Sequence, residues 1–483
     1  GAHSNKVRQA LGKVDWMVNV NLFDNETGSF WRGPGMDPSK IKTEVFMLPC
    51  ASSVEKEGSI ANSGRLQQWR YKAIPYYGDS KPDGDIMSEI FFKVKKLYEK
   101  QGGPNAAAIT KMTWPYGKHE GKEFHYEPRK VAAEINGFFL EDKTVENPTK
   151  KGEFKSFKKG DLVPTFAWLQ DDGSTSSGCW IYCGSVSEKG ILPMRRGQAD
   201  PTGLGLYSEW AWSWPVNRRI IYNGASVDLN GKPWDPSRAV ITWDAKEEKW
   251  KGDVPDGAGN PGKGRPPFIM KPDGVASLYG PGLADGPFPE HYEPLECPVE
   301  KNLLSPQKNN PAIKRFDKEG VGSDMDVYSG VGTCDPRFPF ICSTYRVSEH
   351  WQTGVLTRWC PWLAEMQPGM FVEMSQELAK MRGIETGDKC TVSTARGKVV
   401  CTAIVTPRFK PFDIDGNEIH EIGIPWHFGW ITTKDRPFNK GDKVAEVFTT
   451  GDAANLLTPT IGDANTMIPE SKAFMANVVK GVK

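Results

Sequence analysis

The sequence predicts a protein of mixed class. An α/β layer is expected in residues 1–150, an irregular region in residues 151–335 and a small β-barrel in residues 336–483. Helix and strand patterns alternate in the first part, which is typical of α/β structure. Glycine and proline are dense in the second part, and short strand-like runs recur between turns in the third. A chain of 483 residues has room for about two to four domains of ordinary size.

The first part opens with a helix pattern that leads into a strand pattern. The run VRQALGKVD has the apolar spacing of an amphipathic helix, and WMVNVNLF has the composition of a buried strand. A second strand is expected in EVFMLPCAS, and a helix in DIMSEIFFKVKKLYEKQG, which ends at Gly102. A helix followed by a strand is the second half of a βαβ unit. We therefore expect a partial Rossmann-like layer whose first strand lies upstream of Gly1.

The middle part has few patterns of regular structure. The run KKGEFKSFKKGD predicts a basic, solvated linker. Glycine and proline then crowd the chain from GDVPDGAGNPGKGRPPF to LYGPGLADGPFPEHYEP. So long an irregular stretch indicates an excursion over another surface or a functional lining.

The last part predicts the barrel. Strand-like runs separated by turn residues are FPFICSTYRV, GMFVEMS, KCTVSTA, KVVCTAIV and HEIGIPW. Several short strands at this spacing favour a small barrel. One short helix with a glycine exit is expected in SQELAKMRGIETGD.

Composition excludes several classes of protein. Lys plus Arg is 61 and Asp plus Glu is 60, so the chain lacks the basic excess of a nucleic-acid binder. No apolar run is long enough for a transmembrane helix. The nine cysteines form no CxxC pair, so the usual iron–sulfur and zinc spacings are missing. A disulfide between Cys179 and Cys183 stays open at this point.

Searching for common catalytic motifs identifies no active site. The seven histidines are scattered, and HExxH, GxSxG, GxGxxG and Walker A patterns are all missing. The run FDIDGNEIHE resembles part of a calcium loop, but the spacing of its last glutamate does not fit. We interpret it as a polar hairpin turn.

One polar stretch is unusual: RVSEHWQTGVLTR, residues 346–358. It follows a strand pattern and is rich in hydrogen-bond donors, which suits a polyanionic or heteroaromatic ligand. The guanidinium of Arg346 could hold a phosphate in a forked geometry, with backbone N–H groups near Gly354 adding to it. The alternative interpretation is a solvated loop.

Three blocks of the sequence, taken in order, resemble the C-terminal half of formate dehydrogenase catalytic (alpha) subunits. These subunits belong to the molybdopterin-dependent oxidoreductases of the DMSO reductase superfamily. The blocks are EVFMLPCASSVEKEGSIANSGRLQQWRYKA, TYRVSEHWQTGVLTRWCPWLAEMQPGMFVEMSQELAKMRGIETGDKCTVSTARGKV and NLLTPTIGDANTMIPESKAFMANVV. A further block, EWAWSWPVNRRIIYNGASVDLNGKPW, resembles the respiratory formate dehydrogenases.

This resemblance implies a fold and a cofactor. The barrel is then six-stranded and of the type that binds molybdopterin dinucleotides, and the cofactor is bis-molybdopterin guanine dinucleotide with molybdenum or tungsten. Asn21 stands where the family commonly has a carboxylate that holds guanine, and Asn25 is a second candidate for that role. The residues assigned to cofactor binding are Asn21, Asn25, Arg346, His350, Trp351, Gln352, Thr353, Trp426, His427, Asn455, Ser471 and Lys472. In the first block, Gly58, Asn62 and Arg65 either border the cofactor or a substrate path, or form a structural turn.

The resemblance also implies an activity and partners. The reaction is the reversible oxidation of formate to CO2, with electrons passing through a 4Fe–4S cluster to an iron–sulfur beta subunit. The family's metal-binding selenocysteine or cysteine has no counterpart here. We therefore expect no catalytic residue and no metal ligand in this chain; both should lie in an N-terminal half of the same subunit, exported to the periplasm. The alternatives are another molybdopterin oxidoreductase, such as a nitrate or polysulfide reductase, or a non-catalytic cofactor-binding or assembly module.

Overall fold

In the computed structural model the chain forms two compact units. One unit is Gly1–Leu48 with Leu278–Lys483, and the other is Pro49–Ser277. This division cuts across the predicted boundaries near 150 and 335, because the first 48 residues group with the barrel; the three-part division stays a prediction. The described residues are 1–61, 66–187, 190–191, 210–212, 227–228, 230–239, 241–252, 293, 296–300, 334–431, 449–460, 466, 468–469 and 471–483.

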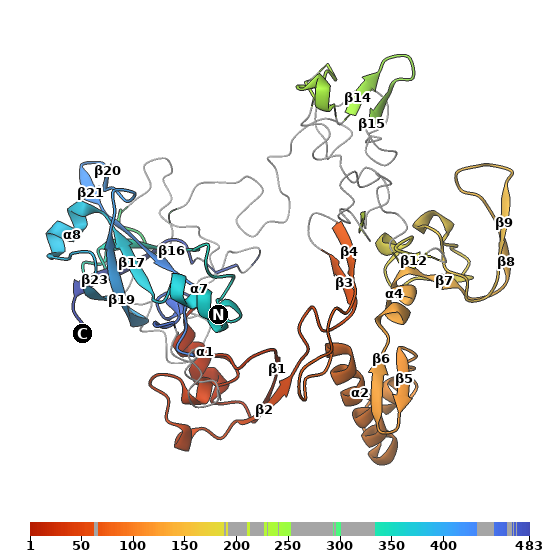
Figure 1. The fold of residues 1–483 in the computed structure, drawn as a ribbon, viewed down its shortest axis with the longest axis horizontal. Helices are drawn as coiled ribbons and strands as arrows, with labels where there is room; N and C mark the ends of the chain where they lie inside the picture. Colours follow the sequence, from red (N-terminus) through yellow and green to blue (C-terminus); the bar gives the residue numbers. More distant parts are fainter. Residues whose placement is uncertain are drawn as a thin grey trace. The chain divides into compact units, whose positions relative to one another are not determined.

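A closed barrel of six strands forms the centre of the first unit (Figure 1). Its strands follow one another around the barrel in the order β16, β22, β17, β19, β18, β23. The predicted barrel is therefore confirmed, and its sixth strand is the run FMANVVK, which the patterns did not single out. The strands are β16 (Phe340–Tyr345), β17 (Phe371–Met374), β18 (Lys389–Thr394), β19 (Gly397–Val405), β22 (Glu421–Pro425) and β23 (Phe474–Lys480).

Alternation along the strands fills the barrel with apolar side chains. In β16 every second residue, beginning with Phe340, is buried. The interior includes Val372, Met374, Ile422 and Ile424. The predicted helix is α8 (Gln376–Arg382), and it packs on this core through Leu378.

The helix α8 is capped at both ends. The Ser375 hydroxyl accepts a hydrogen bond of 3.1 Å from the Leu378 N–H, which satisfies one of the free donors of the first turn. Gly383 follows the last helical residue with φ of 62°, a left-handed conformation that glycine adopts without strain. The glycine exit is therefore confirmed.

Three strands have one end each at the same edge of the barrel. β16 and β22 are parallel, with Tyr345 opposite Pro425. β23 runs antiparallel to β16, with Phe474 opposite Cys342. Because the carboxyl ends of parallel strands meet at one edge, the residues after β16 and β22 and those before β23 come together there.

The amino-terminal segment of this unit contains α1 (Ser4–Leu11), β1 (Trp16–Asn21) and β2 (Glu44–Pro49). The predicted helix and strands are present, but the prediction that WMVNVNLF is buried was wrong. Among the described residues β1 and β2 form a sheet of two strands, and Trp16 is 64% exposed. The face of β1 that carries Trp16, Val18 and Val20 is exposed, whereas Met17, Asn19 and Asn21 on the other face are half-buried.

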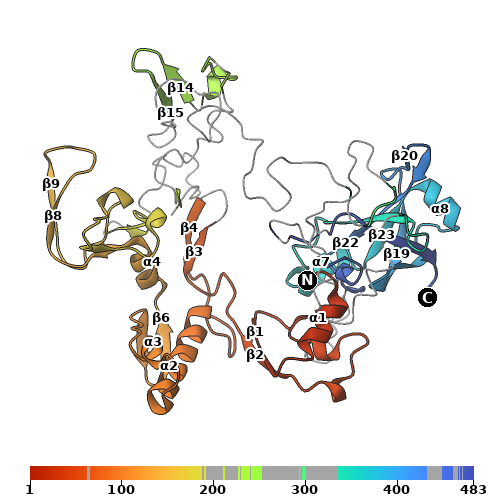
Figure 2. The ribbon, with the colours of Figure 1, turned by 180° about the vertical axis from the view of Figure 1, so that it is seen from behind.

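The predicted polar hairpin is also confirmed. β20 (Phe412–Ile414) and β21 (Asn417–Ile419) pair in antiparallel fashion around Asp415 and Gly416, both of which have positive φ. The Asp413 carboxylate accepts the Gly416 N–H at 3.0 Å. This carboxylate closes the turn, in agreement with the interpretation of FDIDGNEIHE as a hairpin. Figure 2 shows β20 beside α8 at the rim of the barrel.

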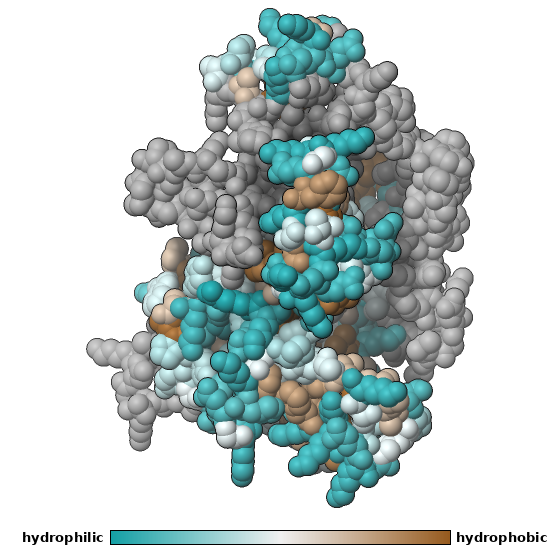
Figure 3. All heavy atoms as spheres, turned by 90° about the vertical axis from the view of Figure 1, so that its right-hand side faces the viewer, coloured by the Kyte–Doolittle hydropathy of each residue, from teal (hydrophilic) through white to brown (hydrophobic). Residues whose placement is uncertain are grey.

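The second unit contains the long helix α2, small hairpins and short helices. The helix predicted in DIMSEIFFKVKKLYEKQG is α2 (Asp83–Gln101), which ends as expected at Gly102 with φ of 67°. Hydrophobic side chains reach the surface on the face shown in Figure 3, where brown areas lie between hydrophilic ones. The other elements include β3 (Gly58–Ala61), β4 (Leu66–Arg70), α3 (Ala106–Thr110), β5 (Gly117–Glu120), β6 (Glu123–Tyr126), α4 (Pro128–Asn136), β7 (Phe138–Phe139), β10 (Thr175–Ser176), β13 (Trp210–Trp212), β14 (Ile241–Asp244) and β15 (Lys249–Gly252).

The predicted basic linker is partly a strand. β9 (Phe154–Phe157) lies within KKGEFKSFKKGD and pairs with β8 (Lys143–Glu146). Phe157 is buried and stacks on Phe139 with ring centroids 4.1 Å apart. Because lysines surround Phe157 in this run, the sequence did not reveal that Phe157 packs in a small hydrophobic core. The prediction of a linker was therefore wrong for this run.

The described cysteines are all free thiols, including Cys179 and Cys183. The Cys183 thiol is buried and donates to the Asn136 carbonyl oxygen at 2.7 Å. Among the described residues, no helix is both long enough and apolar enough to span a membrane.

Candidate functional site

The edge where β16, β22 and β23 meet collects most of the predicted site residues. Arg346 follows β16 directly, and Trp426 and His427 follow β22. Ser471 and Lys472 come just before β23. Parallel pairing of β16 with β22 therefore brings together residues that lie far apart in the sequence.

Two cations and an indole ring lie at this edge. The Arg346 guanidinium carbon lies 5.6 Å from the ring centroid of Trp426, within the range of a cation–π contact. The Lys472 ammonium donates to the Thr344 carbonyl oxygen and, at 3.2 Å, to its hydroxyl. Desolvation, and then repulsion from Arg346, lower the pKa of Lys472. This combination favours an anionic ligand that carries a flat ring.

The polar stretch after β16 is held by His427. The Val347 N–H donates to Nε2 of His427 at 3.0 Å, so the ring proton is on Nδ1 and is donated to the Gln352 carbonyl oxygen. Gln352 has φ of 53°. Burial lowers the pKa of His427, which keeps the ring neutral. His427 therefore stabilises this loop through both of its nitrogens.

Gly354 allows the loop to approach His427 closely. A Cβ atom at this position would lie 1.9 Å from the backbone oxygen of His427, and φ of Gly354 is 76°. Both observations require glycine. The turn is closed by the Gly354 N–H, which donates to the Trp351 carbonyl oxygen at 2.9 Å.

His350 is likewise engaged within the protein. Its Nε2 lies 2.9 Å from the Gln367 carbonyl oxygen and therefore donates, while Nδ1 lies 3.2 Å from the Thr357 hydroxyl. Burial lowers the pKa of His350. The neighbouring Trp351 is 60% exposed. The two histidines thus shape the loop, whereas Trp351 is available to a ligand.

A cavity of about 180 Å³ opens beside the edge, and four predicted residues line it: Asn25, Thr353, Trp426 and Asn455. The Asn25 amide oxygen accepts the N–H groups of Thr27 and Gly28 at 3.0 and 2.9 Å. Asn21 does not line this cavity. Of the two asparagines, Asn25 is therefore the one that the fold brings to the other site residues.

Sequence reasoning missed charged residues in the same wall. Glu26 and Arg358 line the cavity and form an ion pair of 2.8 Å, and both bind the backbone of Ile431. Arg8 also lines it and pairs with Asp452 at 3.0 Å. Arg358 lies in the polar stretch already singled out and Glu26 follows Asn25, so these two could have been considered. Nothing local in the sequence pointed to Arg8.

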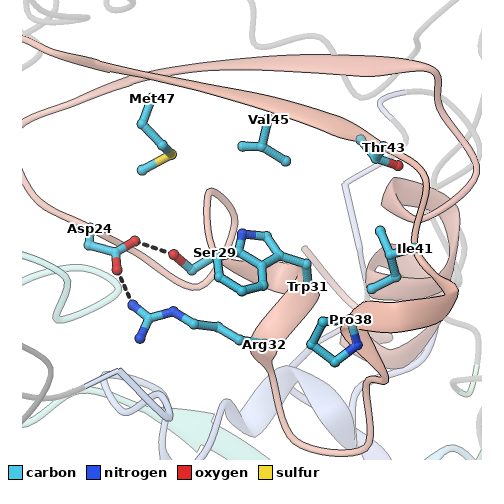
Figure 4. A pocket seen from close by; sticks show the side chains of 9 residues that line it. All are labelled: Asp24, Ser29, Trp31, Arg32, Pro38, Ile41, Thr43, Val45 and Met47. Carbon is cyan, nitrogen blue, oxygen red and sulfur yellow. Dashed lines mark hydrogen bonds and ion pairs between the residues drawn. The ribbon is translucent and has the colours of Figure 1, made fainter.

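A larger cavity of about 550 Å³ lies between β2 and the segment after β1 (Figure 4). Thr43, Val45 and Met47 form one wall, as alternate residues on one face of the chain. Asp24 accepts a hydrogen bond of 2.5 Å from Ser29 and pairs with Arg32 at its polar end. None of the predicted cofactor-binding residues, all of which the structure describes, lines this cavity.

Other predictions fall elsewhere. Gly58 lies in β3 of the second unit, and Asn62 and Arg65 are outside the described residues, as is most of the tryptophan-rich block. Among the described residues, no three or more His, Cys, Asp and Glu side chains lie close enough together to hold a metal ion.

Comparisons with known proteins agree with the barrel. Residues 340–475 match the family model of the Molydopterin dinucleotide binding domain. The formate dehydrogenase subunit alpha of Megalodesulfovibrio gigas is 53% identical over 99% of this chain and 45% of its own length. The formate dehydrogenase 2 subunit alpha (cytochrome c-553) of Nitratidesulfovibrio vulgaris is 43% identical over 100% of this chain and 44% of its own.

Two weaker matches complete the comparison. A nitrate reductase of Symbiobacterium thermophilum is 36% identical over 77 residues, which are 16% of this chain and 10% of its own length. Acetylene hydratase from Pelobacter acetylenicus has a TM-score of 0.42 at 11% identity, over 99% of this chain and 42% of that one, a likeness too weak to carry an argument.

The barrel is thus a molybdopterin dinucleotide-binding domain. Over nearly its whole length, the chain is homologous to formate dehydrogenase alpha subunits of the molybdopterin oxidoreductase family, which confirms the resemblance. The chain spans a little under half of the length of these relatives.

Proposed function

We propose that this chain is part of a formate dehydrogenase large subunit. The reaction is the reversible oxidation of formate to CO2, at a molybdenum or tungsten centre held by two pterin guanine dinucleotides. The observation that carries the proposal is the edge of the dinucleotide-binding barrel, where Arg346, Trp426 and Lys472 meet. Homology to formate dehydrogenase alpha subunits along nearly the whole chain supports the choice of substrate.

The residues at the edge fit such a cofactor. Arg346 and Lys472 supply positive charge for phosphate groups, and Trp426 supplies a face for a flat ring system. The cavity of about 180 Å³ is smaller than a complete small-molecule site of roughly 300–1,000 Å³. It therefore holds one end of a dinucleotide, with the rest lying along the edge.

The remaining site residues divide into two groups in this proposal. Asn25, Thr353 and Asn455 contact the cofactor from the cavity wall, and Trp351 and Ser471 contact it at the rim. His350, His427 and Gln352 act indirectly, because their polar groups hold the loop in shape. Asn21 stays a candidate for the contact with guanine, although it does not line the cavity.

The metal centre supplies the two-electron redox chemistry, and this chain orients the cofactor that carries it. The metal ligand and a 4Fe–4S cluster lie outside this chain, in the N-terminal half of the subunit. The exposed apolar side chains of β1 and β2, with Trp16 at 64%, are the surface that this half covers. Electrons then pass to an iron–sulfur beta subunit in the periplasm.

The test is a measurement on the purified complex that contains this chain. We expect formate-dependent reduction of a viologen dye, about one molybdenum or tungsten per chain, and guanine nucleotide released by acid. Nitrate-dependent oxidation of reduced viologen without formate activity would instead identify a nitrate reductase. Protein with neither metal nor nucleotide would identify a non-catalytic module.

A matched pair of variants connects the activity to the edge. Lys472→Met removes a cation of the site, and Lys389→Met removes a cation on β18, where Lys389 donates to Thr402 at 2.9 Å. We expect the first to lower the guanine nucleotide content several-fold and the second to leave it unchanged. Equal nucleotide content in the two variants would contradict the assignment of Lys472.

A further inference from the structure

A buried carboxylate lies on the outer face of the barrel, next to the proposed cofactor edge. Glu373 is in β17, between Val372 and Met374. Because these two neighbours point into the barrel core, alternation directs Glu373 outward. It is nevertheless only 6% exposed. An acidic side chain buried in this way needs specific partners.

The partners of Glu373 come from two other strands. The Arg408 guanidinium, just after β19, donates through Nε at 2.9 Å and through a second nitrogen to the other carboxylate oxygen. The hydroxyl of Tyr345, the last residue of β16, donates to the same carboxylate at 2.7 Å. Arg408 also lies 5.4 Å from the Tyr345 ring centroid. Both oxygens of the Glu373 carboxylate are thereby engaged within this Tyr345–Glu373–Arg408 triad.

The Tyr345 ring reaches Glu373 by crossing β22. Gly423 lies opposite Glu373 in the antiparallel pair of β17 and β22. A Cβ atom on Gly423 would lie 2.4 Å from the Tyr345 ring and 2.7 Å from that of Phe409. The lack of a side chain at Gly423 therefore provides the space through which the phenol reaches the carboxylate.

Tyr345 connects this triad to the site in two ways. Its carbonyl oxygen accepts the backbone N–H of Trp426 at 3.2 Å. It is also bonded directly to Arg346, whose guanidinium lies over the Trp426 ring. A shift of Tyr345 therefore moves both Arg346 and Trp426, so the triad can act on the site without contacting a ligand.

We infer that Glu373 is a positioning residue, which through Tyr345 holds Arg346 and Trp426 in the arrangement that receives the cofactor. The inference deepens the proposed function and rests on it only for the identity of the ligand. The geometric part of the inference is that Glu373 determines the position of Trp426 through Tyr345. This part does not depend on any ligand.

The first test uses the full chain labelled with 15N-tryptophan. The indole N–H resonance of Trp426 is assigned by its loss in Trp426→Phe. We expect it to shift in both Tyr345→Phe and Glu373→Gln. The control is Asp388→Asn, which removes an ion pair of 2.7 Å with Lys480 from the same barrel, away from the edge, and should leave the resonance in place. An unshifted resonance in Tyr345→Phe and Glu373→Gln would overturn the inference.

The second test separates positioning from a general loss of stability. Guanosine diphosphate, the probe, is titrated into the chain by calorimetry, and Tyr345→Phe is expected to weaken its binding about fivefold to tenfold. In an Arg346→Met background the same change should have little further effect, because residues that act through one another are not additive. Additive losses would indicate a merely structural role and overturn the inference. If the wild type binds no guanosine diphosphate, the cofactor proposal fails, and the inference is decided by the Trp426 resonance.

Discussion

The backbone N–H of Val347 donates a hydrogen bond of 3.0 Å to Nε2 of His427, a residue far away in the sequence. Since Nδ1 also donates to the Gln352 carbonyl oxygen, the loop requires a neutral imidazole with its proton on Nδ1. A protonated ring would place a donor against the Val347 N–H. The conformation of this loop therefore depends on pH through the protonation of His427.

The stability of the barrel should fall in mild acid. Burial lowers the pKa of His427 below the value of about 6.5 that it has in the unfolded chain. Below that pH the unfolded state binds more protons, so this contribution is present above about pH 6.5 and is lost as pH falls through the folded pKa. Urea unfolding at pH 7.5 and 5.5 should show a smaller pH difference for His427→Gln than for wild type. The exposed His119→Gln is the control, and an unchanged pH difference in His427→Gln would refute the prediction.

Gly354→Ala should disrupt the edge. A methyl group there would lie 1.9 Å from the His427 oxygen, in addition to the strain of about 1–2 kcal/mol for a non-glycine residue at positive φ. Gly387→Ala is a matched control, because Gly387 has φ of 96° but no atom within 4 Å of the added carbon. Thermal unfolding should show a clearly larger loss for Gly354→Ala. Similar losses in both variants would mean that the close approach to His427 is relaxed in solution.

Breaking the buried ion pair between Arg396 and Glu296 should strongly lower the free energy of unfolding. Both side chains are nearly inaccessible, and the Glu296 carboxylate also accepts the Met475 N–H at 3.0 Å. Glu296→Gln leaves Arg396 without its counter-charge and should lower the free energy of unfolding by about 3–5 kcal/mol, whereas an apolar double substitution should recover much of it.

The control for that measurement is the exposed pair Lys150–Glu153, 3.4 Å apart. Glu153→Gln should change the free energy of unfolding by less than about 1 kcal/mol. Chemical denaturation of each variant provides the comparison. A small effect of Glu296→Gln would show that water reaches the pair.

Trp16→Lys should impair assembly with the rest of the proposed large subunit. Trp16 is 64% exposed on β1, and burying an unpaired lysine there would be unfavourable. Phe154→Lys, on the hairpin β8–β9 and 63% exposed, is the control. Co-purification with the N-terminal half, expressed as a separate chain, should fall several-fold for Trp16→Lys only. Equal recovery of both variants would argue against β1 as the contact surface.

The sequence by itself determined the barrel domain and the family. Strand alternation, the Ser375 cap and the glycines after α2 and α8 are local features, and local patterns can be recognised without contacts. The strand β9 and the exposure of β1 escaped prediction. Whether an apolar residue is buried depends on what packs against it.

Only the tertiary structure decided which polar residues form a site. Arg346, Trp426 and Lys472 meet because β16 and β22 are parallel and β23 begins at the same edge, and no local pattern encodes that pairing. The same holds for Arg358 with Glu26, and for Tyr345 with Glu373. Hydrogen bonds and ion pairs of this kind depend on distances between strands, which the fold sets and residue type alone does not.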